Sequence, residues 1–486
     1  MPNHPPLRIL FAASEAHPLI KTGGLADVAG SLPRALTGLK QQVRLVLPAY
    51  GSLLARIDKP REVAAFTVGD HAVRILATVL PGSRVTTWLV DCPPLFDRPG
   101  NPYLGPDGQP WPDNALRFFR FAEAVVRIAS DNAGLNWQPD IVHSHDWQTG
   151  LVSALLSRLP ARPATVFTIH NLAYQGLFPW QTFEALRLPG EWWSHHALEF
   201  HGQLSFLKGG LVFADRLTTV SPTYAREIQT PEYGYGLDGL LRHRAAVLSG
   251  ILNGIDVQEW NPGTDPRLAQ NYNRRTLGKK AANKAALQAQ LGLEKREDVL
   301  LIGMVSRLVE QKGVDILLEA LDALLLRPVQ LAILGSGEAR FEQALQAARA
   351  RHPGRIGLQI GYDETLAHRI EAGADLFLMP SRFEPCGLNQ MYSMRYGTPP
   401  LVRPVGGLAD TVIDATDENL AAGTATGFHM TGESGAELVA TVERALALWR
   451  QPERWRRLQD AGMARDFSWR HSAGEYLALY RGITAP

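Results

Sequence analysis

The chain has 486 residues, of which 45% are hydrophobic and 20% charged, a composition that excludes a disordered protein. This length exceeds what one hydrophobic core supports, so two or three domains are expected. Lysine plus arginine number 49 against 48 acidic residues, a balance that argues against nucleic acid as a partner. Only two cysteines occur, Cys92 and Cys386, and they provide neither a disulfide framework nor a zinc motif.

The amino terminus lacks the basic and apolar regions of a signal peptide, and no apolar run reaches membrane-spanning length. We therefore expect no membrane partner. The sequence predicts a cytoplasmic protein that is a monomer or a small homo-oligomer.

The first half of the chain alternates short apolar runs with helical patterns, which is typical of a parallel sheet in an α/β fold. A helix is predicted at Leu25–Leu39. Val63–Val68 and Val73–Leu80 flank Gly69-Asp70 and predict a hairpin. The other predicted strands are Leu7–Ala12, Val43–Pro48, Asp140–His145, Thr165–His170 and Arg216–Ser221.

The alternation loosens around Leu252–Asn261 and then restarts, which predicts a domain boundary. Residues 433–483 have mostly helical patterns. The expected domains are residues 1–251, residues 252–460, and a terminal helix in 461–486 that crosses back onto the first domain. The strands predicted in the second half are Val299–Val305, Val329–Leu334, Gly357–Ile360, Leu376–Pro380 and Pro400–Arg403.

The five residues Gly-Gly-Leu-Ala-Asp occur at 23–27 and again at 406–410. Each copy lies between a strand-like run and a helix-like run. Glycines at the start of a helix leave backbone N–H groups that bind anions, so the two copies predict one anion site in each of two similar halves. Two ordinary strand-to-helix turns that share small residues would give the same pattern.

Three loops that follow predicted strands carry charged residues, and ligands of open α/β sheets bind beyond the carboxyl ends of strands. The first loop contains Lys21. The second contains Arg307 and Lys312, a guanidinium and an ammonium suited to one diphosphate. The third contains Glu384 before a helix expected to begin near Gly387. A surface lysine, solvated turn charges and a helix-capping carboxylate are the alternative interpretations of these residues.

His143-Ser144-His145-Asp146 contains residue types that bind metals. Strand side chains alternate, so His143 and His145 share a face, and a core role is favoured over metal ligation. His170-Asn171 ends the next strand and is expected at the same rim. The chain has no Asp-x-Asp motif, so no metal bridging a nucleotide diphosphate is indicated. Nucleophile-elbow and Walker motifs are also missing, as is Gly-x-Gly-x-x-Gly after the first strand.

Together these segments resemble the signature blocks of the bacterial glycogen synthases and plant starch synthases, retaining glycosyltransferases of family five. They follow the family's order and span nearly the whole chain. The blocks are Lys21-Thr22-Gly23-Gly24-Leu25-Ala26-Asp27, His145-Asp146-Trp147, Thr168-Ile169-His170-Asn171, Asn253-Gly254-Ile255-Asp256, Ser306-Arg307 with Gln311-Lys312-Gly313, and Ser381-Arg382-Phe383-Glu384-Pro385-Cys386-Gly387-Leu388.

The resemblance implies the GT-B fold, in which two Rossmann-like α/β domains face each other across a deep cleft. It implies transfer of glucose from ADP-glucose to the non-reducing end of an α-1,4-glucan with retention of configuration. No metal and no pyridoxal phosphate are implied, so the expected partners are the nucleotide sugar and a glucan such as glycogen. The choice between ADP and UDP depends on the base pocket and stays open.

The resemblance also assigns residues to the site. The catalytic set is Lys21, His170, Arg307, Lys312 and Glu384. The donor-binding set is Gly23, Gly24, Asp27, Asp146, Asn171, Asn253, Tyr362, Cys386, Gly387, Leu388 and Asn389. Tyr362 is expected to stack near the adenine, Tyr103 resembles an acceptor-side position, and no metal ligand is assigned. Two positions depart from related enzymes: Tyr392 stands where other retaining families carry a second Glu, and Asn389 stands where Thr is expected.

Two other functions stay possible on the same general fold. A phosphorylase would need a lysine that forms a Schiff base with pyridoxal phosphate. A glucan-binding scaffold built on an inactive transferase would have no need of Lys21, Arg307, Lys312 and Glu384 together. No carboxylate is placed as a covalent nucleophile, so same-face attack is favoured, with the leaving phosphate taking the acceptor's proton.

Overall fold

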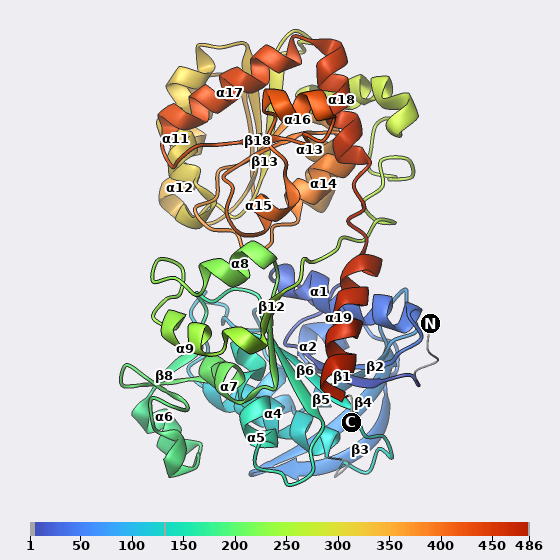
Figure 1. Ribbon diagram of the computed structural model, residues 1–486, viewed down its shortest axis with the longest axis vertical. Coiled ribbons are helices and arrows are strands. Elements are labelled where there is room, and N and C mark those ends of the chain that lie inside the picture. The colour runs from blue at the N-terminus through green and yellow to red at the C-terminus, as the bar shows by residue number, and fades with distance from the viewer. Residues whose placement is uncertain (1–4, 131–132, 485–486) are drawn as a thin grey trace. The chain divides into compact units, whose positions relative to one another are not determined.

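The computed structural model describes residues 5–130 and 133–484. It divides into two compact units (Figure 1): unit 1 is Met1–Gly254 with Trp469–Pro486, and unit 2 is Ile255–Ser468. The sequence suggested divisions after 251 and after 460. Asn253 and Gly254 stay with unit 1 because Gly254 packs against the backbone of Trp469, and α18 (Pro452–Met463) continues past 460 within unit 2.

Unit 1 is built on a nine-stranded sheet in the order β12-β11-β7-β6-β1-β2-β5-β4-β3. The strands from β12 to β5 are parallel, and β4 and β3 complete the sheet as an antiparallel hairpin at 61–79, as the sequence predicts. The bounds are β1 Arg8–Ala12, β2 Gln42–Pro48, β3 Arg61–Val68, β4 His71–Val79, β5 Thr86–Asp91, β6 Ile141–His145, β7 Ala164–Ile169, β11 Arg216–Thr219 and β12 Leu248–Gly250.

A small antiparallel sheet, β8-β10-β9, also belongs to unit 1, and the sequence patterns gave no sign of it. Its strands are β8 Leu177–Pro179, β9 Glu199–Phe200 and β10 Gln203–Ser205. The α-helices of unit 1 are α1 Gly24–Gly38, α2 Gly51–Leu54, α3 Pro93–Phe96, α4 Asn114–Ala129, α5 Gly150–Leu156, α6 Trp180–Ala185, α7 Phe206–Phe213, α8 Pro222–Glu227, α9 Asp238–His243 and α19 Trp469–Thr484.

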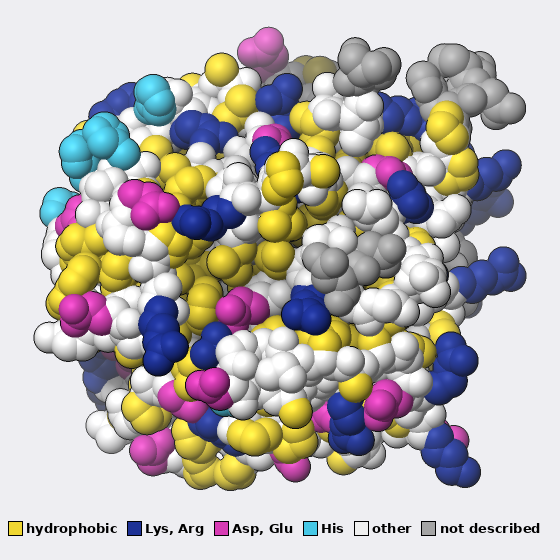
Figure 2. Space-filling view, turned by 90° about the horizontal axis from the view of Figure 1, so that it is seen from below, with side chains coloured by type: hydrophobic (Ala, Val, Ile, Leu, Met, Phe, Trp, Pro, Cys, Tyr) yellow, Lys and Arg dark blue, Asp and Glu magenta, His cyan; other side chains and the backbone are white. Residues whose placement is uncertain are grey.

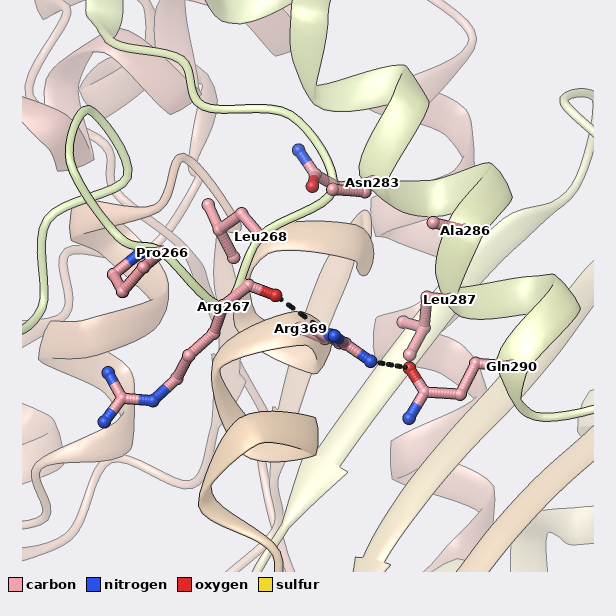
Figure 3. Close-up of a pocket in the computed structure, with 9 residues that line it drawn as sticks. Pro266, Arg267, Leu268, Asn283, Ala286, Leu287, Gln290 and Arg369 are labelled. Atoms are coloured by element: carbon pink, nitrogen blue, oxygen red, sulfur yellow. Dashed lines mark hydrogen bonds between the residues drawn. The ribbon is translucent and has the colours of Figure 1, made fainter.

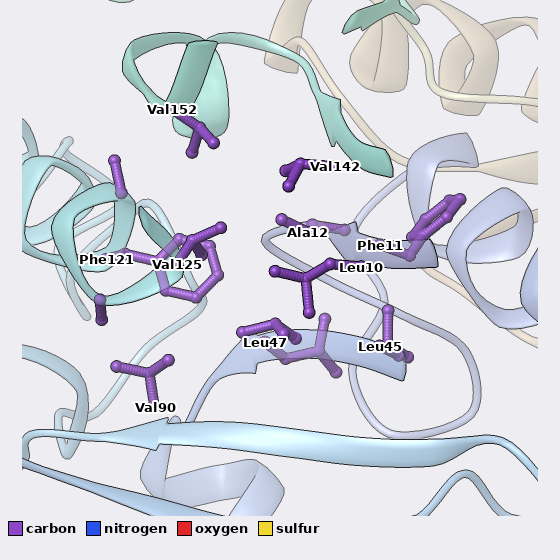
Figure 4. Close-up of a cluster of buried hydrophobic side chains, with 14 of the residues drawn as sticks. Leu10, Phe11, Ala12, Leu45, Leu47, Val90, Phe121, Val125, Val142 and Val152 are labelled. Atoms are coloured by element: carbon purple, nitrogen blue, oxygen red, sulfur yellow. The ribbon is translucent and has the colours of Figure 1, made fainter. Parts of the chain in front are cut away.

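The core of unit 1 follows the alternation of strand side chains. Figure 4 shows Leu10 and Ala12 of β1 facing Phe121 and Val125 of α4, while Phe11 between them points the other way. All are buried, and this is why β1 reads as a continuous apolar run in the sequence.

Helix α19 returns to unit 1 after the chain has passed through unit 2, as expected. Its Ala473, Tyr476 and Tyr480 are fully buried in the unit 1 core. The Tyr480 hydroxyl also lies 2.7 Å from His143 Nδ1 on β6, which ties the last helix to the centre of the sheet.

Unit 2 contains a six-stranded parallel sheet in the order β15-β14-β13-β16-β17-β18. The strands are β13 Leu300–Val305, β14 Val329–Gly335, β15 Ile356–Ile360, β16 Leu376–Met379, β17 Pro400–Val402 and β18 Phe428–His429. The α-helices are α10 Lys280–Gln290, α11 Val314–Leu325, α12 Ala339–Arg351, α13 Glu364–Gly373, α14 Asn389–Arg395, α15 Gly406–Thr411, α16 Asp417–Ala422, α17 Gly435–Trp449 and α18. The predicted α/β class with parallel sheets is confirmed in both units.

Candidate active site

Both large sheets have a topological switch point, where strand order reverses and ligands of such folds bind. In unit 1 the first strand, β1, has β2 on one side and β6 on the other. In unit 2 the first strand, β13, has β14 and β16 as its neighbours. The loops that leave β1, β6, β13 and β16 are therefore the places to look, and they hold most of the predicted site residues.

The loop after β1 is held by Glu15, a buried carboxylate to which the sequence interpretation gave no role. Its Oε2 accepts hydrogen bonds from the Thr22 backbone N–H at 2.5 Å and from the Thr22 hydroxyl at 2.8 Å. Burial raises the pKa of Glu15 to about 7, against these hydrogen bonds, which favour the ionised form. Its position in the loop after the first strand, three residues beyond Ala12, was the sequence signal that could have identified it.

The neighbouring predicted residues pair locally. Lys21 Nζ lies 2.8 Å from Asp27 Oδ1 in a partly exposed ion pair. The hydroxyl of Tyr103, the predicted acceptor-side residue, lies 2.8 Å from Ser14 Oγ in the same loop.

Gly23 and Gly24 lie where α1 begins, and no side chain caps this helix. A Cβ atom added at either glycine would meet nothing within 4 Å, and neither has a positive φ. The fold therefore has no steric need for glycine at these positions. Space beside an uncapped helix start is the arrangement that an anionic ligand requires.

Asp146, directly after β6, has a strained backbone. Its φ of 56° and ψ of −179° belong to a region that residues other than glycine rarely adopt. Its Oδ1 accepts the backbone N–H of His170 at 2.7 Å, and a backbone hydrogen bond from Asn171 also reaches this carboxylate. Burial raises the pKa of Asp146 to about 7. The strained residue thus fixes the end of β7, where the predicted His170 and Asn171 lie.

His143 and His145 are fully buried and share one face of β6, as their spacing predicts, with ring centroids 4.1 Å apart. His143 Nε2 lies 2.6 Å from the Thr168 hydroxyl. His145 Nδ1 lies 2.9 Å from His170 Nε2. Burial lowers the pKa of His170 to about 3 and those of the other two well below the usual value, so all three rings are neutral at pH 7.

Asn253, the remaining unit 1 position of the donor set, lies one residue before the end of the first segment of unit 1. Its side chain is buried, and its Oδ1 accepts no hydrogen bond from any residue in 5–130 or 133–484.

In unit 2, Lys312 and Glu384 come together. Lys312 Nζ lies 2.5 Å from Glu384 Oε2, and both side chains are largely buried. The Ser381 hydroxyl donates to the same oxygen at 3.2 Å. The loops after β13 and β16 thus present a paired ammonium and carboxylate, groups that the sequence interpretation had given to phosphate and sugar separately.

Arg307 is exposed at the carboxyl end of β13, and Gln311 orients it. Arg307 Nη2 donates to Gln311 Oε1 at 3.1 Å, and Gln311 Nε2 donates to the Phe383 carbonyl at 3.2 Å. Gly313 has a φ of 70°, and a Cβ there would lie 2.1 Å from the Pro380 carbonyl oxygen. The two loops are therefore packed against each other, which fixes Arg307 relative to Glu384.

The segment after Glu384 differs from expectation in one respect. Helix α14 begins at Asn389 rather than near Gly387. Its N-cap residue is Leu388, whose side chain makes no capping hydrogen bond. Gly387 instead has a φ of 69°, and a Cβ there would lie 2.5 Å from Gln390 Oε1. The side chain of Asn389 donates to the Val305 carbonyl at 2.7 Å. The residue at this position therefore anchors α14 to the end of β13.

The second Gly-Gly-Leu-Ala-Asp copy is not an open anion site, which corrects the sequence prediction. The Gly407 N–H donates to the carbonyls of Glu384 at 3.1 Å and Pro385 at 3.2 Å. A Cβ at Gly406 would lie 1.9 Å from the Glu384 oxygen, and one at Gly407 2.1 Å from the Cys386 oxygen. This copy packs against the backbone of the Glu384 loop and stabilises it.

Two aromatic positions have different surroundings. Tyr362, the predicted adenine neighbour, follows β15 with 75% of its surface exposed, and its hydroxyl donates to Glu364 at 2.9 Å. Tyr392 is buried and stacks on Trp260 at a centroid distance of 3.8 Å. The residue that replaces a second Glu therefore has a packing role.

A pocket of about 320 Å³ in unit 2 holds none of the predicted site residues. It lies between α10, α13 and residues 266–269, and Arg369 on its wall donates to Gln290 and to the Arg267 carbonyl (Figure 3). Arg267 also lies 3.8 Å from Glu259 and from Glu364. Those two carboxylates and His368 form the one group of potential metal ligands found within the described ranges.

The face of the molecule drawn in Figure 2 is mixed in character. On the face drawn in Figure 2, basic, acidic and hydrophobic side chains lie side by side. Among residues 5–130 and 133–484, no helix has the length and apolar character needed to cross a membrane.

Comparison with known proteins finds similarity over the whole chain. Residues 8–243 match the family model of the starch synthase catalytic domain, and residues 288–459 match that of glycosyl transferases group 1. The chain is 58% identical to glycogen synthase 1 of Methylococcus capsulatus over 99% of this chain and 97% of that protein. It is 57% identical to the glycogen synthase of Cellvibrio japonicus over 98% and 99%.

A solved structure is similar as well. The catalytic domain of starch synthase IV from Arabidopsis thaliana, bound to ADP and acarbose, matches with a TM-score of 0.90 and 32% identity over 99% of this chain and 100% of that one.

Proposed function

Since the chain belongs to the glycosyltransferase family of the bacterial glycogen synthases and plant starch synthases, we propose that it transfers glucose from ADP-glucose to the non-reducing end of an α-1,4-glucan. The configuration at the anomeric carbon is retained. The observation that carries the proposal is the Lys312–Glu384 pair at the switch point of unit 2, with Arg307 oriented beside it. A site for a nucleotide sugar needs fixed cations for the diphosphate and fixed acceptors for the sugar.

Glucose transfer builds negative charge on the departing diphosphate. Arg307 and Lys312 neutralise that charge in this proposal, and Lys21 contacts the donor, as the family resemblance implies. Because Gln311 and Glu384 hold Arg307 and Lys312 in place before substrate binds, little reorganisation of these two side chains is needed during the reaction. In this proposal, side-chain cations take the place of a metal ion.

The sugar is held by Glu384, by the backbone of Cys386, Gly387 and Leu388, and by His170. Glu384 accepts hydrogen bonds from sugar hydroxyls, and the carbonyl of His170 offers a fixed dipole to positive charge at the anomeric carbon. Asp146 maintains the geometry of His170 and Asn171 through backbone hydrogen bonds. The acceptor hydroxyl attacks on the face from which the phosphate leaves, and that phosphate takes its proton.

The remaining assignments follow the same proposal. Tyr362 contacts the adenine, Tyr103 lies on the acceptor side, and Asn253 contributes to donor binding. The protein acts in the cytoplasm, alone or as a small homo-oligomer, and needs no pyridoxal phosphate.

The proposal is tested by incubating the protein with ADP-glucose or UDP-glucose in the presence and absence of glycogen, and measuring nucleotide release. Release of ADP that depends on glycogen is expected. Glycogen binding without nucleotide release would favour the scaffold, and a visible absorbance band from pyridoxal phosphate would favour the phosphorylase.

Variants at the unit 2 site link the activity to its residues. Arg307→Ala is expected to lower turnover by roughly 10²–10³-fold with the fold unchanged. Arg351→Ala, an exposed arginine at the end of α12, is the matched control and keeps full turnover. Glu384→Gln is expected to lower turnover more than nucleotide affinity, and the reverse result would remove Glu384 from the sugar site.

A further inference from the structure

His145 is a buried histidine that the transfer reaction as described does not use. It is fully buried at the end of β6, and its Nδ1 lies 2.9 Å from Nε2 of His170. Its backbone is fixed by Thr149, whose hydroxyl donates to the His145 carbonyl at 2.7 Å. Phe11 packs on its ring with a centroid distance of 4.1 Å. The imidazole therefore has one orientation and one polar contact with the candidate site.

The hydrogen-bond network assigns the proton between the two rings. His145 Nε2 is buried and has no hydrogen-bond partner in residues 5–130 or 133–484. If that nitrogen carried the proton, a buried N–H would be orphaned, which folded proteins avoid more strictly than an orphaned acceptor. The proton of neutral His145 therefore lies on Nδ1, and Nδ1–H donates to His170 Nε2.

This assignment fixes the tautomer of His170 as well. A neutral imidazole carries one proton, so when His170 Nε2 accepts, the His170 proton must lie on Nδ1. We propose that His145 is a positioning residue that holds His170 with Nδ1–H as a hydrogen-bond donor for a hydroxyl oxygen of the transferred sugar. The proposal rests on the proposed function, in which His170 lies beside that sugar.

The tautomer can be measured without any activity. In protein labelled with ¹⁵N on its histidine rings, a long-range ¹H–¹⁵N NMR correlation spectrum at pH 7 should show that His170 is protonated on Nδ1 and unprotonated on Nε2. His170→Gln identifies the signal by removing it. A His170 ring protonated on Nε2 in the parent protein would overturn the proposal.

Substitutions test the consequence for transfer. His145→Asn keeps an amide N–H near the place of Nδ1, whereas His145→Leu has a similar size and no donor. His145→Leu is expected to lower kcat roughly 10²-fold with little change in donor KM, since a small misplacement of a catalytic group has that effect. His145→Asn is expected to recover most of the loss.

His143 provides the control, because it is equally buried on the same strand and its ring lies 4.1 Å from that of His145, but its hydrogen-bond partners are Tyr480 and Thr168 instead of His170. His143→Leu should lower Tm while kcat of the folded fraction stays near the parent value. Equal kcat losses in His145→Asn and His145→Leu would make His145 a purely structural residue. The same conclusion would follow if the kcat losses of the His143 and His145 variants were both proportional to their losses in Tm. If the parent protein shows no transfer, the proposed function fails, and the tautomer measurement alone decides the role of His145.

Discussion

The two copies of Gly-Gly-Leu-Ala-Asp have the same residues, but the surroundings of their glycines are opposite. At Gly23 and Gly24 an added Cβ would meet no atom within 4 Å. At Gly406 it would lie 1.9 Å from the Glu384 backbone oxygen, and at Gly407 2.1 Å from that of Cys386, both far inside van der Waals contact. The space beside the first pair is open, while the loop that carries Glu384 fills the space beside the second pair.

The supports of the two copies differ in kind as well. The first copy is held by the buried Glu15 carboxylate through Thr22, and the second by backbone carbonyls that accept the Gly407 N–H. A repeated motif therefore does not imply a repeated function. Glycine in the first copy has open surroundings, as the proposed donor site requires, and glycine in the second copy allows close packing of two backbone segments.

Gly407→Ala should have the largest effect on stability. The new methyl group would lie 2.1 Å from the Cys386 oxygen, so the backbone of the Glu384 loop or of α15 must move. We expect a loss of about 3 kcal/mol in the free energy of unfolding, at the upper end for overpacking, together with loss of turnover. Urea unfolding and the nucleotide-release assay measure the two effects. Gly278→Ala, where a Cβ meets nothing within 4 Å in the same unit, is the control. A Gly407→Ala protein as stable as this control would contradict the packing role.

Glu15→Gln tests the support of the first copy through the pH dependence of stability. Burial raises the pKa of Glu15 in the folded state from 4.5 to about 7. Between pH 4.5 and pH 7, the folded state therefore keeps a proton on Glu15 that the unfolded state has released. Parent stability therefore falls as the pH rises from about 4.5 to 7 because of this group, and the loss is complete above pH 7.

Glutamine stays neutral and still accepts from Thr22. The stability of Glu15→Gln relative to the parent should therefore rise with pH across that window, by up to about 3 kcal/mol. Chemical unfolding at pH 5, 6, 7 and 8 measures the difference. If the free energies of unfolding of Glu15→Gln and the parent differed by the same amount at all four pH values, Glu15 would not titrate in this range.

Much of the fold and the family could be predicted from the sequence, because both rest on local patterns. Buried parallel strands are uninterrupted apolar runs, and residues 9–12 and 300–305 are of this kind. The resemblance to glycogen and starch synthases depended on short blocks in a fixed order, and the similarity over nearly the whole chain confirms it.

The support of the site could not be predicted, because it depends on contacts between distant segments. Glu384 contacts Gly407, which follows β17 at the start of α15, and His145 contacts His170 because β6 and β7 pair. The small sheet β8-β10-β9 was missed because its strands have two or three residues, too few to show a period.

Gly24→Ala should have the smallest effect on stability and the most selective effect on function. Alanine at the first residue of α1 meets no atom within 4 Å and favours a helix more than glycine, so the free energy of unfolding should rise by about 0.5–1 kcal/mol. If the room beside this helix start belongs to the nucleotide sugar, donor KM should rise about tenfold, which corresponds to about 1.4 kcal/mol of binding. Gly38→Ala, at the other end of the same helix with equally open surroundings, should leave donor KM unchanged. If Gly24→Ala and Gly38→Ala gave the same donor KM, the space at the first copy would have no ligand to hold, and the contrast between the two glycine pairs would be one of packing alone.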